Sequence, residues 1–282
     1  MIIAVTGATG QLGRLAVQFL LDRGVAATDV VAIGRDVAKL DDLAARGVQV
    51  RRADYDQPET LTPALAGVEK LLLVSGSEIG RRLAQHTAVI EAARAAGVDL
   101  LVYTSSPNAD TASYSIAAEH RATERVLAES GVPHVVLRNG WYLENYTAQL
   151  STYLEHGIVG AAGDGRIAAA TRADLAEAAA VVLTTDGYAG QLLSLGGPAF
   201  TMAELAAELS QQSGRDVSYT DLPEAQLVEV LVGAGLPRPF AAVLADADTA
   251  ASMGGLDLDP TDLEKVLGRP ATTLSEAVRD AL

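Results

Sequence analysis

Three glycines near the start of the chain have the spacing of a nucleotide-binding loop. They stand in Gly7-Ala8-Thr9-Gly10-Gln11-Leu12-Gly13, directly after an apolar run and directly before a segment of helical period. Glycine suits such a loop because the chain turns tightly and its backbone must approach a diphosphate closely. The following helix then offers free N–H groups and its positive dipole end to the phosphates. This context favours a dinucleotide site over the alternative, an ordinary tight turn.

The end of the second apolar run indicates which dinucleotide is bound. An NAD site typically places a carboxylate there, which accepts a hydrogen bond from the ribose 2′-hydroxyl. Here Arg35 comes first, and Lys39 follows one helical turn later. Both cations suit the 2′-phosphate of NADPH, and we assign the neighbouring Asp36 to the N-cap of the next helix. The sequence therefore favours NADPH, with Arg35 as a solvated loop cation as the alternative.

Small and polar residues follow the third, fourth and fifth apolar runs, where ligands bind in parallel α/β sheets. We expect Asp54 to bond the adenine amino group, and Thr104 to lie beside the nicotinamide. Small residues after the fourth run would let a cofactor lie flat against the chain. The candidate cofactor-binding residues at these three ends are Asp54, Tyr55, Ser75, Gly76, Ser77, Thr104 and Ser105.

The elements that would position these residues alternate along the first half of the chain. Short apolar runs, which we interpret as strands, cover residues 2–6, 30–33, 48–51, 70–74, 100–104 and 134–138. Segments of helical period lie at 12–23, 37–46, 81–96 and 117–130. This repetition predicts right-handed βαβ units and an α/β fold, a doubly wound parallel sheet of the Rossmann type with helices on both faces.

Beyond residue 138 the alternation ends. We expect a helix at 173–184, strands at 191–197 and 217–220, and otherwise helices separated by proline-rich loops. The predicted organisation is an NADP-binding Rossmann domain over residues 1–156, with contributions from 170–197. A smaller, mostly helical C-terminal region on the substrate side covers residues 157–282.

Composition excludes several classes of function. The net charge is −15, and the 21 Lys and Arg residues are scattered, so we expect no nucleic-acid partner. The chain has no cysteine, and its four histidines lie far apart, so we expect no metal site. No signal peptide and no run of about 18 apolar residues is visible. We expect a cytoplasmic protein without membrane insertion, and the sequence leaves a homodimer open.

Three further segments, with the glycine loop, carry a family resemblance. Residues 103–106, 138–146 and 161–174 resemble the NmrA-like branch of the atypical short-chain dehydrogenases, and most nearly its bacterial type 2 NAD(P)H:quinone oxidoreductases. The resemblance runs nearly end to end. It implies two-electron hydride transfer from NADPH to a quinone without flavin, beneath a segment 139–146 that closes over the nicotinamide. The candidate cofactor-binding residues that it adds are Asn139, Gly140, Trp141, Tyr142, Glu144, Asn145 and Arg172.

The helix at 117–130 lacks the proton-transfer pair of alcohol-oxidising dehydrogenases. Those enzymes use Tyr-x-x-x-Lys, but here Tyr114 is followed four residues later by Ala118. His120 stands where related reductases carry their lysine. We therefore take His120 and Tyr142 as candidate catalytic residues, and a quinone as a substrate that needs little acid–base help. The alternatives are a histidine bonded between helices and a tyrosine in the core.

Two other functions remain open at this stage. A non-catalytic NADP-binding redox sensor of the NmrA type would use the same glycine loop. A reductase or epimerase acting on a carbonyl or sugar substrate is less compatible with the missing Tyr/Lys pair.

Overall fold

The computed structural model describes residues 1–282 and is built around one seven-stranded parallel sheet. The strand order is β3-β2-β1-β4-β5-β6-β8, so the order reverses between β1 and β4. A ligand crevice is expected at such a reversal, beyond the carboxyl ends of the strands. The strands are β1 (Ile3–Val5), β2 (Val30–Gly34), β3 (Gln49–Arg52), β4 (Lys70–Leu73), β5 (Leu100–Ser105), β6 (His134–Asn139) and β8 (Leu192–Leu195).

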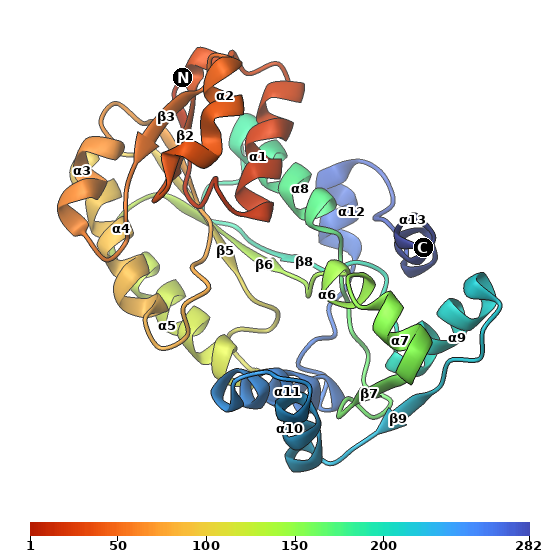
Figure 1. Cartoon of the computed structure of the whole chain (residues 1–282). Coiled ribbons are helices and arrows are strands. Elements are labelled where there is room, and N and C mark those ends of the chain that lie inside the picture. The colour runs from red at the N-terminus through yellow and green to blue at the C-terminus, as the bar shows by residue number, and fades with distance from the viewer.

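Helices cover both faces of this sheet (Figure 1). On one face α1 (Gln11–Asp22) and α8 (Arg172–Thr184) pack against a core that contains Ile3 and Val5. On the other, α3 (Leu61–Ala64), α4 (Arg82–Ala96) and α5 (Ser115–Glu129) cover a core that contains Ala4. Because both faces are buried, the central strands β1 and β2 are apolar throughout, as the sequence pattern indicates, whereas the edge strand β3 carries polar residues and is only partly buried. The doubly wound α/β prediction is confirmed.

Most of the chain after β6, apart from α8 and β8, forms a smaller layer at one end of the sheet (Figure 1). A parallel pair of short strands, β7 and β9, lies among helices there, and α12 returns to pack against α8. None of the helices combines the length and hydropathy that a bilayer-spanning helix requires. The elements of this part are α6 (Glu144–Thr147), α7 (Leu150–His156), β7 (Ile158–Gly160), α9 (Met202–Ser213), β9 (Tyr219–Asp221), α10 (Glu224–Gly233), α11 (Arg238–Ser252), α12 (Thr261–Leu267) and α13 (Leu274–Ala281).

The structure differs from the expected elements in two places. Residues 37–46 do not form one helix, because Val37–Leu40 is a 3₁₀ turn and α2 covers only Asp41–Ala45. Strand β7, which pairs with β9 from Ile158 to Gly160, was not expected from its glycine- and alanine-rich sequence. The division of the chain at residue 156 stays a prediction. Leu263 and Val266 of α12 belong to the same core as α1.

Candidate functional site

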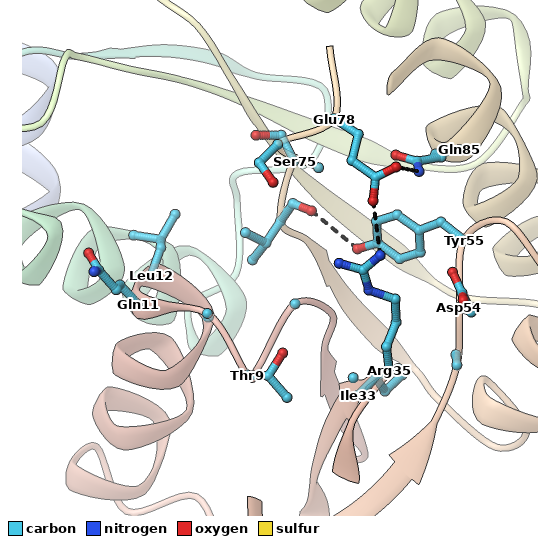
Figure 2. Close-up of a pocket in the computed structure, with 18 of the residues that line it drawn as sticks. Thr9, Gln11, Leu12, Ile33, Arg35, Asp54, Tyr55, Ser75, Glu78 and Gln85 are labelled. Carbon is cyan, nitrogen blue, oxygen red and sulfur yellow. Dashed lines mark hydrogen bonds and ion pairs between the residues drawn. The ribbon is translucent and has the colours of Figure 1, made fainter. Parts of the chain in front are cut away.

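A pocket of about 580 Å³ opens where the strand order reverses, at the carboxyl ends of β1, β2, β3 and β4. Figure 2 shows its lining side chains converging from these ends. Of the residues singled out in the sequence, the pocket is lined by Gly7, Thr9, Gly10, Gln11, Leu12, Gly13, Arg35, Asp54, Tyr55, Ser75, Gly76, Ser77, Tyr142 and Arg172.

The loop between β1 and α1 requires glycine at two of its three glycine positions. Gly7 has φ +60°, a conformation that side chains with a Cβ rarely adopt. A Cβ on Gly13 would lie 2.4 Å from the carbonyl oxygen of Gly7, so α1 packs directly on the turn. Ala8 is fully buried, and its N–H donates to the carbonyl of Ile33 over 3.0 Å. Ala8 therefore holds the loop to β2 and does not line the pocket.

The first turn of α1 is suited to bind an anion. The backbone N–H groups of Gln11, Leu12 and Gly13 have no acceptor within the protein, and Gly10 provides no side-chain cap. The N–H groups of a helix's first turn normally need a side chain, water or a ligand as partner. Three free donors at a positive dipole end, beside a glycine turn, fit the diphosphate of a dinucleotide.

Arg35, at the end of β2, lies in the pocket with its guanidinium directed at Glu78 (Figure 2). Its Nη1 donates to Oε1 of Glu78 over 2.9 Å. Lys39 does not line the pocket, since it is exposed and its Nζ lies 3.9 Å from Oδ2 of Asp36. Asp36 occupies the expected N-cap position, but of a 3₁₀ turn rather than of an α-helix, and its side chain accepts no capping hydrogen bond there.

The segment after β4 is held in place by side chains from three other elements. The N–H of Val74 donates to Oγ1 of Thr6, and the N–H of Ser75 donates to Oγ1 of Thr104. The N–H of Gly76 donates to Nε2 of His86. Thr104 is buried and does not line the pocket. It contacts the site only through the backbone of Ser75.

Tyr142 and Arg172 lie together at the other end of the pocket. The guanidinium carbon of Arg172 stands 4.3 Å from the centroid of the Tyr142 ring. Its Nη1 is 3.4 Å from Oε2 of Glu144, and its Nη2 donates to Oδ1 of Asn145 over 3.0 Å. Glu144 and Asn145 line a second hollow of about 570 Å³, which shares Gln11 and Arg172 with the pocket. Burial raises the pKa of Tyr142, and the positive charge of Arg172 opposes that shift.

A model of the NAD(P)H-binding family matches residues 7–186. The chain belongs to this family. Quinone oxidoreductase 2 of Escherichia coli is 52% identical over 278 residues, which are 98% of this chain and 97% of that protein. A crystal structure of an E. coli NADPH-dependent quinone oxidoreductase complexed with NADPH has a TM-score of 0.96, with 51% identity over 98% of both chains. An NmrA-like family domain-containing oxidoreductase of Aspergillus flavus is 30% identical over 99% of this chain and 94% of its own. The NmrA-like resemblance is confirmed.

Four other residues that the sequence predicts as cofactor-binding do not line the pocket. Ser105 donates from Oγ to Glu124 over 2.6 Å, inside a buried cluster with Arg138. Trp141 packs edge-on against Tyr114, with ring centroids 6.5 Å apart. Gly140 is enclosed, because a Cβ there would lie 2.3 Å from the carbonyl of Ala168. The fourth, Asn139, is 4% exposed, and neither atom of its side-chain amide has a partner.

His120 is buried behind the pocket and does not line it. Its Nδ1 shares a hydrogen bond of 2.6 Å with the hydroxyl of Tyr103. Burial, with the nearby positive charge of Arg82, holds the pKa of His120 well below its usual range. The His120 side chain thus joins α5 to β5. This geometry favours the alternative interpretation, in which the histidine is hydrogen-bonded between two elements of the fold.

Sequence reasoning missed some of the residues that line the pocket. Four of them lie directly beside predicted residues at the strand ends and follow from extending each predicted cluster by one residue, and Ile33 follows from extending by two. Gln85 has no such signal, because it comes from α4. The missed residues are Ile33, Gly34, Ala53, Val74, Glu78 and Gln85.

Proposed function

We propose that this protein is an NADPH-dependent quinone reductase that reduces its substrate by two electrons in one hydride transfer, without flavin. The observation that carries the proposal is 52% identity, over 98% of the chain, to quinone oxidoreductase 2 of E. coli. The pocket supports it, because its donors and charges suit NADPH and it lies at the sheet edge where such cofactors bind.

Each end of the pocket has a role in holding the cofactor. The free N–H groups of Gln11, Leu12 and Gly13 would receive the diphosphate. Arg35 would bind the 2′-phosphate, and the segment 75–77 would line the middle of the cofactor. When bound, NADPH supplies the hydride, and a quinone needs one proton besides to become a hydroquinone.

We assign that proton to solvent. Tyr114 cannot serve as the base of an alcohol dehydrogenase, because its hydroxyl donates to the carbonyl of Pro107 over 2.9 Å and burial raises its pKa to about 12. Tyr142 has a raised pKa and lines the pocket. It therefore keeps its proton at neutral pH and can donate a hydrogen bond to a quinone oxygen.

Asn139, at the end of β6, is another polar group at this edge of the sheet. Its amide is buried without a partner, and an unpaired buried amide costs about 1–3 kcal/mol. We propose that Asn139 gains its partner when the cofactor and substrate are bound. Glu144 and Asn145 would then orient Arg172 beside the cofactor.

The test is a steady-state assay with flavin-free protein, NADPH and benzoquinone. We expect the NADPH absorbance to disappear in step with one hydroquinone formed per NADPH, and no semiquinone signal by electron paramagnetic resonance. Semiquinone release would contradict hydride transfer. NADPH binding without turnover of any quinone in a panel would leave the NADP-binding sensor as the better description.

A further inference from the structure

A carboxylate faces Arg35 across the pocket. Glu78 and Arg35 both line it, and Nη1 of Arg35 donates to Oε1 of Glu78 over 2.9 Å. Figure 2 shows this contact spanning the space between the end of β2 and the segment after β4. The guanidinium that suits the 2′-phosphate of NADPH therefore already has an anionic partner within the protein.

The Arg35–Glu78 ion pair is exposed enough to be exchanged. The Arg35 side chain is 65% exposed and that of Glu78 is 33% exposed. Water screens such pairs, so they contribute little to stability. A phosphate carries more charge than a carboxylate and has more oxygens for a bidentate contact with arginine. It can therefore replace Glu78 at Arg35.

Glu78 has other hydrogen-bond and ion-pair partners when Arg35 binds the 2′-phosphate. Its second carboxylate oxygen, Oε2, lies 3.5 Å from Nη1 of Arg81 and accepts from Nε2 of Gln85 over 3.3 Å. Arg81 is itself anchored by Asp56, whose Oδ1 lies 2.8 Å from its Nη2. Glu78 would remain on these groups, with its negative charge still close to the phosphate.

We propose that Glu78 sets the selectivity between NADPH and NADH by competing with the 2′-phosphate for Arg35. The inference rests on the cofactor site of the proposed function. NADH has no 2′-phosphate, so it leaves the Arg35–Glu78 pair intact. NADPH must break that pair and tolerate the carboxylate beside its phosphate. Glu78 therefore lowers the affinity for NADPH and leaves the affinity for NADH nearly unchanged.

The experiment measures binding of adenosine 2′,5′-bisphosphate and of adenosine 5′-monophosphate by calorimetry, with the wild type and Glu78→Gln. The substitution keeps the size of the side chain and removes its charge. Glu229→Gln is the matched control, because Glu229 also pairs with an arginine, Arg238, at 2.6 Å, but on α10 outside the pocket. It changes the net charge equally without touching the site.

We expect Glu78→Gln to bind the bisphosphate about three- to tenfold more tightly, with the monophosphate unchanged. High salt should shrink the gain, because it screens charges near the surface. Glu229→Gln should bind both probes as the wild type does. An unchanged affinity of Glu78→Gln for the bisphosphate, or an equal change for both probes, overturns the inference. A wild-type protein that binds neither probe overturns the proposed cofactor site as well.

Discussion

The backbone N–H of Gly76 donates to Nε2 of His86 over 2.9 Å, which ties the pocket-lining segment after β4 to helix α4. Because Nε2 accepts, the neutral ring carries its proton on Nδ1, which lies 3.2 Å from Oγ1 of Thr123. Arg82 holds the same peptide segment from its other side, donating from Nε to the carbonyl of Gly76 over 2.9 Å. His86 thus positions the segment without lining the pocket.

Replacing His86 should disturb both stability and cofactor binding. His86→Leu leaves the N–H of Gly76 without an acceptor, so we expect the free energy of unfolding to fall by about 1–3 kcal/mol. NADPH binding should weaken, and hydrogen exchange at Gly76 should accelerate. His86→Gln, whose amide oxygen can accept the same bond, should recover part of each loss. Equal NADPH affinity in the wild type and His86→Leu would contradict the positioning role.

The pH dependence of stability offers a separate check on His86. Burial of the ring and the charge of Arg82 lower its pKa to about 3. The unfolded chain binds a proton on this histidine near pH 6.5 but the folded chain does not. Its contribution to stability is therefore complete above that pH and is lost as the pH falls toward 3. We expect the stability of the wild type relative to His86→Gln, measured by urea unfolding, to fall between about pH 7 and 5. A constant difference would show that the ring titrates normally.

The close contact between Gly13 and Gly7 predicts a severe effect of one added methyl group. In Gly13→Ala the new Cβ would lie 2.4 Å from the carbonyl oxygen of Gly7. The loop must shift, so we expect a loss of about 1–3 kcal/mol in stability and a large loss of NADPH binding. Gly233→Ala in α10 is the control, since nothing lies within 4 Å of its Cβ. That variant should be neutral or slightly stabilised. Calorimetry compares the NADPH affinity of the two variants, and thermal unfolding compares their stability. If Gly13→Ala binds NADPH as tightly as the wild type does, the loop is not part of the cofactor site.

Arg35 and Lys39 looked equivalent in the sequence, but the structure separates them. Arg35 lines the pocket, and Lys39 does not. Arg35→Ala should weaken NADPH binding by about 1.5–3 kcal/mol, the scale of hydrogen bonds to a charged group, and leave NADH binding unchanged. Lys39→Ala should stay within about 0.5 kcal/mol of the wild type for both cofactors. Calorimetric titration with each cofactor decides this, and equal losses of NADPH and NADH in Arg35→Ala would exclude contact with the 2′-phosphate.

The parts of the site that follow local rules were predictable from the sequence. The glycine loop and the strand ends are set by an apolar run, a turn and a helix that are adjacent in the chain. Lys39 lies outside the pocket, in a 3₁₀ turn over residues 37–40 whose periodicity differs from that of the expected α-helix. Gln85 could not be found, because its place depends on how the segment 74–81 leads into α4. These outcomes depend on tertiary packing, which overrides local propensity.

The position of His120 has a similar origin. Its helix was predicted within two residues of the observed bounds of α5. Its partner was not predicted, although alternation along β5 provides a signal. Tyr103 lies in the same core as Leu101 and points to the α4 and α5 side, whereas its neighbour Thr104 contacts Ser75. Counting alternate positions along residues 100–105 would have placed the Tyr103 hydroxyl toward the helix that carries His120.

The last prediction concerns that pair. Tyr103 and His120 share a buried hydrogen bond of 2.6 Å, outside the pocket. Tyr103→Phe and His120→Leu should each lower stability, and the double variant should lose less than their sum, with a coupling energy of about 0.5–3 kcal/mol by urea unfolding. Because neither side chain lines the pocket, kcat with benzoquinone should stay within about threefold of the wild type. If kcat instead falls by about 10–100-fold while the NADPH affinity stays unchanged, His120 takes part in catalysis, because a loss of that size is the scale of lost acid–base catalysis.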